Sequence, residues 1–193
     1  MDKKTQIINA AIEVFAKHGL EKGKISNIAK VAKIGKGTVY EYFKSKDEIF
    51  RAIEKMFIFD SIDQINSLTQ SEKSPTEKIE EIISYNINMH AVMGDAALIL
   101  AELWAQHGRG QLHGHKDSVF ADMYNDYHSA VLDVLTRGIK IGEFREMNKD
   151  GVASLLLALI DGLIWQSIIF KNDKNFDEYK KAAIKSFMNG IKK

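Results

Sequence analysis

The chain has 193 residues, 45% hydrophobic and 27% charged, which excludes a disordered tail and is enough for one sizeable core or for a small domain fused to a larger one. Its net charge is only +1, yet residues 1–50 carry ten lysines against six acidic residues, and such a basic N-terminal part attracts DNA. Cysteine is absent, which excludes disulfides, thiolate catalysis and cysteine-ligated zinc and is compatible with the cytoplasm, where we expect the protein to act.

Apolar residues recur at helical spacing along the whole chain, and no segment alternates as a strand would. Local signals mark several helix ends: Gly19 ends the first helix, Ser45 and Glu48 form a capping box before the fourth, and Pro75 opens the fifth. The predicted helices are residues 3–18, 25–32, 36–43, 46–70, 75–92, 96–107, 116–141, 150–171 and 176–190. The predicted fold class is therefore all-α, with about nine helices.

Residues 25–43 hold two short amphipathic helices joined by a tight turn at residues 33–35. In the first helix, apolar residues recur at the spacing i, i+3, i+4, i+7 of a buried face. The second helix buries Val39 and Phe43, four residues apart, and directs lysine, hydroxyl and phenol groups elsewhere. A helix that only faced a core would need no such display of hydrogen-bond donors.

This chemistry is typical of a DNA-binding helix, because about two helical turns fit the major groove with the N-terminal residues against base edges. Gly37 has no Cβ, so the backbone can approach the duplex closely. Lys36 can bind guanine acceptors or a phosphate, and the Thr38 hydroxyl can reach either. Tyr40 and Tyr42 can donate to phosphate oxygens, which fix the register of the complex.

The same region resembles the DNA-binding domain of the TetR (tetracycline-repressor) family. The similarity covers Thr5 to about Phe50, where the stretches IINAAIEVFAKHG and IAKVAKIGKGTVYEYFKSKDEIF resemble the family's amphipathic first helix, its IA..AGVSKGTLY.YF.SKE.L pattern and the start of its long fourth helix. The resemblance implies a three-helix helix-turn-helix domain followed by a helical ligand-binding and dimerisation domain, here residues 1–46 and 47–193. The expected DNA-binding residues are Lys24, Lys36, Gly37, Thr38, Tyr40, Tyr42 and Lys46.

Three residues depart from the family pattern. Lys24 stands where the family has a threonine that caps the second helix and touches phosphate, so a charge contact would replace a capping bond. Lys33 stands in place of a glycine, and Gly35 in place of a serine.

The most apolar stretch is LLLALIDGLIWQSIIF. It is apolar on nearly every side, so we expect a partner to bury it. Its length raises the possibility of a membrane span, but Asp161 and Gln166 favour a buried interface helix, and we expect no membrane contact. With the last helix it would form a four-helix interface across a two-fold axis. A looser resemblance to betaine-regulator-like family members, in which LW, a glycine before the eighth helix and DGL recur, also supports a homodimer. The predicted interface residues are Leu157, Ile164, Trp165, Ile168, Ala183 and Phe187.

A ligand cavity in the helical body would combine aromatic walls with a few polar groups. The candidate residues are Asn86, Met89, Trp104, Phe120, Tyr124, Tyr127 and Asp161. Each is also compatible with an ordinary core position. Asp161 in particular has a structural alternative, in which its carboxylate bonds a hydroxyl or amide across the dimer.

Three histidines, His107, His113 and His115, lie in a glycine-broken stretch and form either a polar loop or a metal site. No serine elbow, paired acid motif or HExxH sequence is present, so we expect neither catalysis nor a cofactor. The alternative is an all-helical enzyme or ligand-binding protein that uses the C-terminal pocket.

The sequence as a whole predicts a homodimeric, ligand-responsive transcription regulator. The double-stranded operator would be near-palindromic, because a dimer sets its two helices about 34–36 Å apart. A small apolar or amphipathic effector would release the repressor from that operator.

Overall fold

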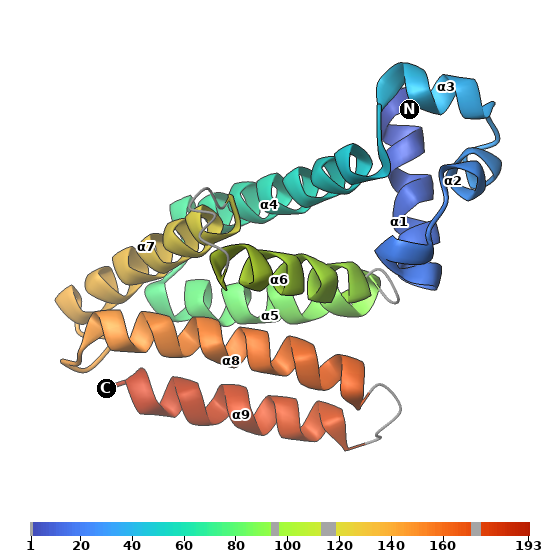
Figure 1. Cartoon of the computed structure of the whole chain (residues 1–193). Coiled ribbons are helices and arrows are strands. Elements are labelled where there is room, and N and C mark those ends of the chain that lie inside the picture. The colour runs from blue at the N-terminus through green and yellow to red at the C-terminus, as the bar shows by residue number, and fades with distance from the viewer. Residues whose placement is uncertain (1, 94–96, 113–118, 171–174) are drawn as a thin grey trace. The chain divides into compact units, whose positions relative to one another are not determined.

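The computed structural model describes residues 2–93, 97–112, 119–170 and 175–193, without the side chains of residues 89–93, 111, 112 and 119 (Figure 1). Regular structure among these residues is helical, apart from one isolated bridge between Phe144 and Lys192. The helices are α1 (Lys3–Lys22), α2 (Ile25–Val31), α3 (Lys36–Tyr42), α4 (Lys46–Gln70), α5 (Pro75–Met93), α6 (Ala97–Leu112), α7 (Val119–Lys140), α8 (Lys149–Ile169) and α9 (Phe176–Ile191). The all-α class is confirmed.

Two helices run further than predicted. Gly19 interrupts α1 with a φ of 72°, as a helix-ending glycine does, but one more turn follows and the helix ends at Lys22. Helix α6 continues past His107 and through Gly108 to Leu112. A glycine inside a helix costs only about 1 kcal/mol, so it does not by itself end one.

The chain forms two compact units. The first contains Met1–Asp60 and Met93–Phe120, and the second contains Ser61–Val92 and Ala121–Lys193. Helix α4 therefore contributes to both units, while α6 belongs to the first and α8 and α9 to the second.

The helix-turn-helix part of the first unit is built on the apolar face of α1. Ile7, Ala11 and Phe15 are buried at spacings of four, and they pack with Ile28 of α2 and Val39 of α3 into one small core. The Gln6 side chain donates to the Ala32 carbonyl at 2.7 Å, at the end of α2. These contacts leave one side of α3 free of the core.

The turn between α2 and α3 contains Lys33 with a φ of 54°. This is the left-handed region, in which an L residue with a Cβ costs about 1–2 kcal/mol and glycine costs nothing sterically. The geometry gives a physical reason for the glycine that the TetR pattern has at this position.

We expect Lys33→Gly to raise the free energy of unfolding by up to about 1 kcal/mol, because the relieved strain exceeds the entropy that glycine adds to the unfolded chain. Urea denaturation midpoints at an unchanged m-value would measure it. Lys30→Gly, inside α2, is the matched control and should lower stability by roughly 0.5–1 kcal/mol. A lower midpoint for Lys33→Gly would contradict the strain assignment.

The second unit has a core contributed by α5, α7, α8 and α9. Ile82, Val131, Leu135 and Leu156 are completely buried in it. Phe144, in the link after α7, packs directly over Gly138, where any Cβ would overlap the phenylalanine ring. This contact closes the α7 end of the core.

The same link is bonded to the end of α9. The backbone of Arg145 donates to the Ile191 carbonyl at 3.0 Å, and the backbone of Lys193 donates to the Glu143 carbonyl at 3.1 Å. The Arg145 guanidinium adds bonds to the Asn189 and Lys192 carbonyls. The last turn of α9 is therefore fixed to the α7–α8 link.

Among the described helices, α8 alone is long and apolar enough to cross a membrane, with a mean hydropathy of 1.9. Only 22% of that apolar window is buried within the subunit. One face of α8 packs on α9, which runs beside it in Figure 1, and on the core. Much of its apolar surface is therefore left uncovered by the described residues of the subunit.

Candidate nucleic-acid interface and ligand site

Part of the surface of helix α3 is exposed. Val39 and Phe43 are 0% and 2% exposed and hold the helix on α1 and α2, whereas Tyr40 and Tyr42 are 46% and 43% exposed. The Lys36 ammonium lies 5.7 Å from the centre of the Tyr40 ring, a cation–π distance that aligns the two side chains. Lys36 and Tyr40 therefore share one side of the exposed surface of α3, suitable for the edge of a duplex, and Tyr42, two residues on, is exposed on another side.

Gly37 lies in the first turn of α3 and is exposed. No heavy atom of the subunit lies within 4 Å of the position its Cβ would occupy. Packing within the subunit therefore gives no reason for a glycine there, although glycine costs a helix roughly 0.5–1 kcal/mol relative to alanine. An outside surface that approaches the backbone does give one. Thr38, the next residue, is half-buried.

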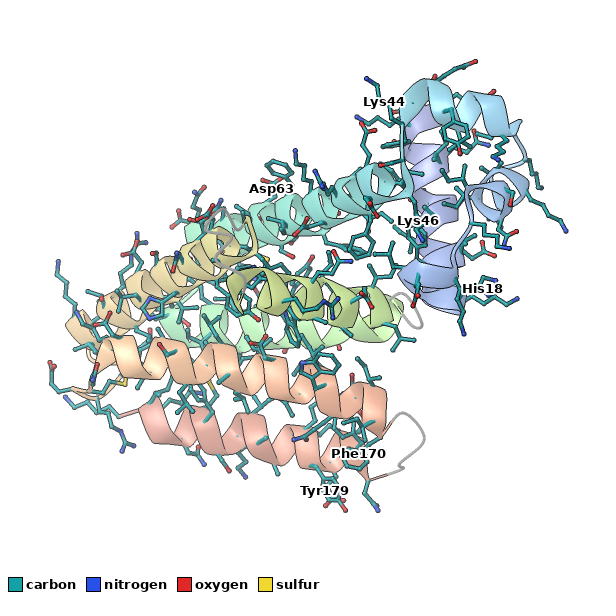
Figure 2. All side chains as sticks on the ribbon, in the orientation of Figure 1. His18, Lys44, Lys46, Asp63, Phe170 and Tyr179 are labelled. Carbon is teal, nitrogen blue, oxygen red and sulfur yellow. The ribbon has the colours of Figure 1, made fainter. Side chains whose placement is uncertain are left out.

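Two further lysines were predicted to contact DNA. Lys24 precedes α2 and makes no side-chain capping bond, which leaves its ammonium available while the helix start is capped by backbone geometry alone. The Lys46 ammonium donates to the Glu21 carbonyl at 2.9 Å, at the end of α1. Figure 2 labels Lys46 beside that end of α1, so in this structure Lys46 joins α4 to α1.

The start of α4 has one bond of the predicted capping box at Ser45, and the second bond is displaced to the residue before it. The Glu48 backbone donates to the Ser45 hydroxyl at 3.1 Å, and the Glu48 carboxylate accepts from the Lys44 backbone at 2.7 Å. A complete capping box, with both bonds between Ser74 and Glu77, opens α5 and depresses the pKa of Glu77 through the Ser74 backbone bond. These bonds fix where α4 and α5 begin.

Four of the predicted ligand residues lie in the second unit. The Tyr124 hydroxyl donates to the Asp161 carboxylate at 2.8 Å, which joins α7 to α8. Tyr127, one turn further along α7, donates to the Ser61 carbonyl at 3.3 Å and also bonds Asn86 of α5. The hydroxyl that Asp161 was expected to find across a dimer is supplied by its own subunit.

Burial dominates the acid–base properties of these groups. It raises the pKa of Asp161, against the opposing effect of the Tyr124 hydrogen bond. Burial also raises the pKa of Tyr127 to about 12, so this phenol stays a neutral donor. The second unit therefore offers two phenols, an amide and a carboxyl within an otherwise apolar body.

Asp161 should make stability depend on pH. Because its folded pKa is raised, the protein is most stable where this carboxyl is protonated and loses stability as pH rises from about 4, the unfolded pKa, through the folded value. The asparagine of Asp161→Asn cannot ionise. The melting temperature of this variant minus that of the wild type should therefore increase as the pH rises through that window. Tyr124→Phe, which removes the bond that favours the carboxylate, should steepen the wild-type dependence. A difference between Asp161→Asn and wild type that is independent of pH would refute this prediction.

Of the other predicted ligand residues, Met89 also belongs to the second unit, and the remaining two do not. Trp104 and Phe120 belong to the first unit, where their rings meet edge to face with centroids 6.4 Å apart. The Met89 side chain lies outside the described residues. Sequence reasoning missed Glu54, a half-buried carboxyl on α4 whose pKa is raised by burial, and which lies near His107.

No group of three or more potential metal ligands occurs in the described part of the chain. His107 lies in α6, stacked at 5.9 Å on Phe120, instead of in the expected loop. His113 and His115 lie outside the described residues.

Apolar side chains remain exposed along α8 and α9. Leu155 is 57% exposed, Ile169 70% and Tyr179 56%. On α8, Leu155 and Ile169 share one helical face with Ala158, Gly162 and the exposed polar Gln166, at spacings of i, i+3, i+7, i+11 and i+14. Sequence reasoning missed this face because α8 is apolar all round and its period does not mark an exposed side.

The interface residues predicted from the sequence are buried or half-buried in the single subunit. Trp165 and Ile168 are half-buried within the single subunit. The other four lie in the subunit's own core or pack against it: Leu157, Ile164, Ala183 and Phe187.

Known proteins resemble this chain over its whole length. Residues 7–53 match the family model of bacterial regulatory proteins of the tetR family. The fatty acid metabolism regulator protein of Bacillus subtilis (strain 168) is 29% identical over 178 residues, 91% of this chain and 87% of its own length.

Solved structures show the same fold. The transcriptional regulator FadR from Bacillus subtilis in complex with stearoyl-CoA has a TM-score of 0.75 at 23% identity, covering 97% of this chain and 98% of its own. A transcriptional regulator from Saccharomonospora viridis in complex with choline has a TM-score of 0.84 at 19% identity, covering 98% and 97%. One fold thus accommodates ligands as different as an acyl thioester and a small cation.

Proposed function

Since the chain belongs to the TetR family of bacterial transcription regulators, we propose that it is a homodimeric repressor that a long-chain acyl thioester releases from a near-palindromic operator. The observation that carries the choice of effector is the nearly full-length similarity to a regulator of fatty acid metabolism, together with the shared fold of a regulator that binds stearoyl-CoA. The protein would act in the cytoplasm, where its operator is.

The residues of the second unit support an amphipathic effector. Its core is formed almost entirely by aliphatic side chains, which suit an acyl chain. Tyr124, Tyr127, Asn86 and the raised-pKa carboxyl of Asp161 are the polar groups available to orient a carbonyl or amide. A ligand with a long apolar part and few hydrogen-bonding groups fits such an environment better than a small charged metabolite.

The dimer rests on the exposed apolar face of α8. Leu155, Ala158, Gly162 and Ile169 offer large residues at the ends and small ones in the middle, which allows two helices to cross closely. Figure 2 labels Phe170 and Tyr179 at one end of the α8–α9 pair, and both are largely exposed. Two such pairs would form a four-helix interface and set the two α3 helices on successive turns of one face of DNA.

The operator must first be isolated, by selecting bound fragments from genomic DNA with the full-length protein. Palmitoyl-CoA should then weaken operator binding about 5- to 150-fold, the range of a coupling of about 1–3 kcal/mol. Operator DNA should weaken palmitoyl-CoA binding by the same factor, because the two equilibria are linked. Free coenzyme A should have a much smaller effect, since it lacks the acyl chain.

Other results would separate the alternatives. If palmitoyl-CoA binds without changing operator affinity, it is not the effector, and choline would be tested next in the same assay. If a free thiol appears during incubation with the protein, the thioester has been hydrolysed and the enzyme alternative gains support. We expect the ligand to be recovered unchanged.

A further inference from the structure

A cavity of about 440 Å³ lies in the second unit where α4 ends, α5 begins and α7 ends. Its lining includes one carboxylate, Glu72, against four cationic side chains: Lys73, Lys78, Arg137 and Lys140. The bonds that join Tyr124 to Asp161 and Tyr127 to Ser61 lie among residues that do not line this cavity.

Lys78 is the unusual member of this group. It is 5% exposed and is the one charged residue that the described part of the chain buries. Its ammonium donates to the Thr69 carbonyl at 2.8 Å, near the end of α4, and forms no ion pair among the described residues. An ammonium carries three donors, and buried charges are normally paired, so two donors remain for a counter-ion or water.

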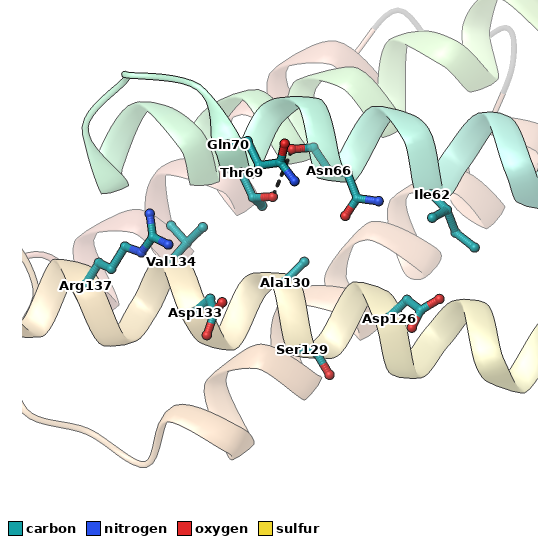
Figure 3. A pocket seen from close by; sticks show the side chains of 10 residues that line it. All are labelled: Ile62, Asn66, Thr69, Gln70, Asp126, Ser129, Ala130, Asp133, Val134 and Arg137. Carbon is teal, nitrogen blue, oxygen red and sulfur yellow. Dashed lines mark hydrogen bonds between the residues drawn. The ribbon is translucent and has the colours of Figure 1, made fainter.

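Arg137 and Lys140 are exposed in the last turn of α7. Neither side chain forms a hydrogen bond or ion pair with another described residue of the subunit. Figure 3, which shows the neighbouring pocket between α4 and α7, labels Arg137 and Asp133 on successive turns of α7 and draws no hydrogen bond between them. All five N–H donors of Arg137 are therefore available to a ligand.

Local charges compensate part of this cluster. The carboxyl ends of α4 and α7 together supply roughly one negative charge, which attracts cations to these positions in any protein. Glu81 pairs with Lys73, and Glu72 lines the cavity. Because Lys73 pairs with Glu81 and interacts with Glu77, the cations that remain in the lining are Lys78, Arg137 and Lys140, against the single carboxylate of Glu72.

We propose that this cavity binds a phosphate group, with Lys78, Arg137 and Lys140 as its donors. Lysine provides a point charge for a phosphate, and the arginine fork matches two of its oxygens. The size of the cavity suits a pyrophosphate or a nucleotide better than a single small ion. The phosphate belongs either to the head of an acyl thioester or to a separate phosphorylated metabolite.

Calorimetric titration of the full-length protein with sodium pyrophosphate at low salt tests the site. We expect binding at one site per subunit, and the double variant Arg137→Gln, Lys140→Gln should weaken it at least about tenfold, since hydrogen bonds to charged groups are lost. Both side chains are exposed and bond nothing in the subunit, so the variant should fold normally. The control Lys181→Gln, Lys185→Gln removes two exposed charges from α9 and should change the dissociation constant by less than about twofold. Absence of binding, or equal weakening by both double variants, would overturn the proposal.

Competition identifies the source of the phosphate. If palmitoyl-CoA displaces pyrophosphate, the site receives the head of the effector, and if both bind together, it receives a separate metabolite. Pyrophosphate that binds while palmitoyl-CoA leaves operator affinity unchanged would support this site and refute the proposed effector. The reverse result would refute this site alone.

Discussion

Ile169→Glu is expected to convert the protein into a folded monomer that no longer binds its operator with high affinity. Ile169 is 70% exposed in the single subunit, so a glutamate there would be solvated and would leave the fold intact. In a dimer built on this face of α8, the two-fold axis would bring two such carboxylates into an apolar contact, and burying an unpaired charge costs about 3–5 kcal/mol or more. Sedimentation equilibrium at micromolar concentration would measure the loss, with circular dichroism to check helicity.

A matched control is available in the same unit. Ile141, in the link after α7, is 62% exposed, and Ile141→Glu makes the same chemical change away from α8. This variant should remain dimeric and bind DNA as the wild type does. If Ile169→Glu also remains dimeric, the face formed by Leu155, Ala158, Gly162 and Ile169 is not the interface.

The second large effect is expected at α3, the helix proposed to bind the DNA major groove. Lys36→Ala should weaken operator binding by about 1–3 kcal/mol, roughly 5- to 150-fold, because Lys36 is proposed to contact a base edge or phosphate and to orient Tyr40. The melting temperature should stay near that of the wild type, since Lys36 is exposed and contributes nothing to the core. Lys185→Ala on α9 is the control in mobility-shift titrations. Normal binding by Lys36→Ala would remove this residue from the interface.

Gly37→Ala should change stability and binding in opposite directions. The added methyl meets no atom within 4 Å and improves helix propensity, so the protein should become more stable by up to about 1 kcal/mol. Operator affinity should nevertheless fall, because the methyl occupies the space into which the duplex is proposed to fit. A variant that gains stability and binds normally would leave the glycine unexplained.

Much of the helix-turn-helix domain, residues 1–46, could be predicted from its sequence because its signals are local. The capping box at Ser45, the turn at residues 33–35 and the alternation of buried and exposed residues in α3 all depend on neighbours a few positions apart. The family pattern adds residue types at known offsets. The structure then supplies what the pattern lacks, such as the positive φ of Lys33.

In residues 47–193 the helices could be predicted, but which of their side chains are exposed could not. The sequence of α8 is apolar on every side, so it could not indicate that Leu157 packs inward while Leu155 is exposed. The Tyr124–Asp161 bond joins residues 37 positions apart, and only the packing of α7 on α8 brings them together. The cluster of Lys78 and Arg137 likewise depends on how the ends of α4 and α7 meet the start of α5. The periodicity of the sequence does not indicate this arrangement.

The contact between Gly138 and Phe144 has a practical consequence for engineering this protein as a biosensor. Any side chain at position 138 would have to displace a ring that is 1% exposed and wedged between α7 and the end of α9. Random libraries across α7 would therefore lose most members with a change there to misfolding, whatever their ligand preference. A library that keeps Gly138 and Phe144 and varies Asn86, Tyr124 and Tyr127 would devote its diversity to the groups proposed to orient the effector.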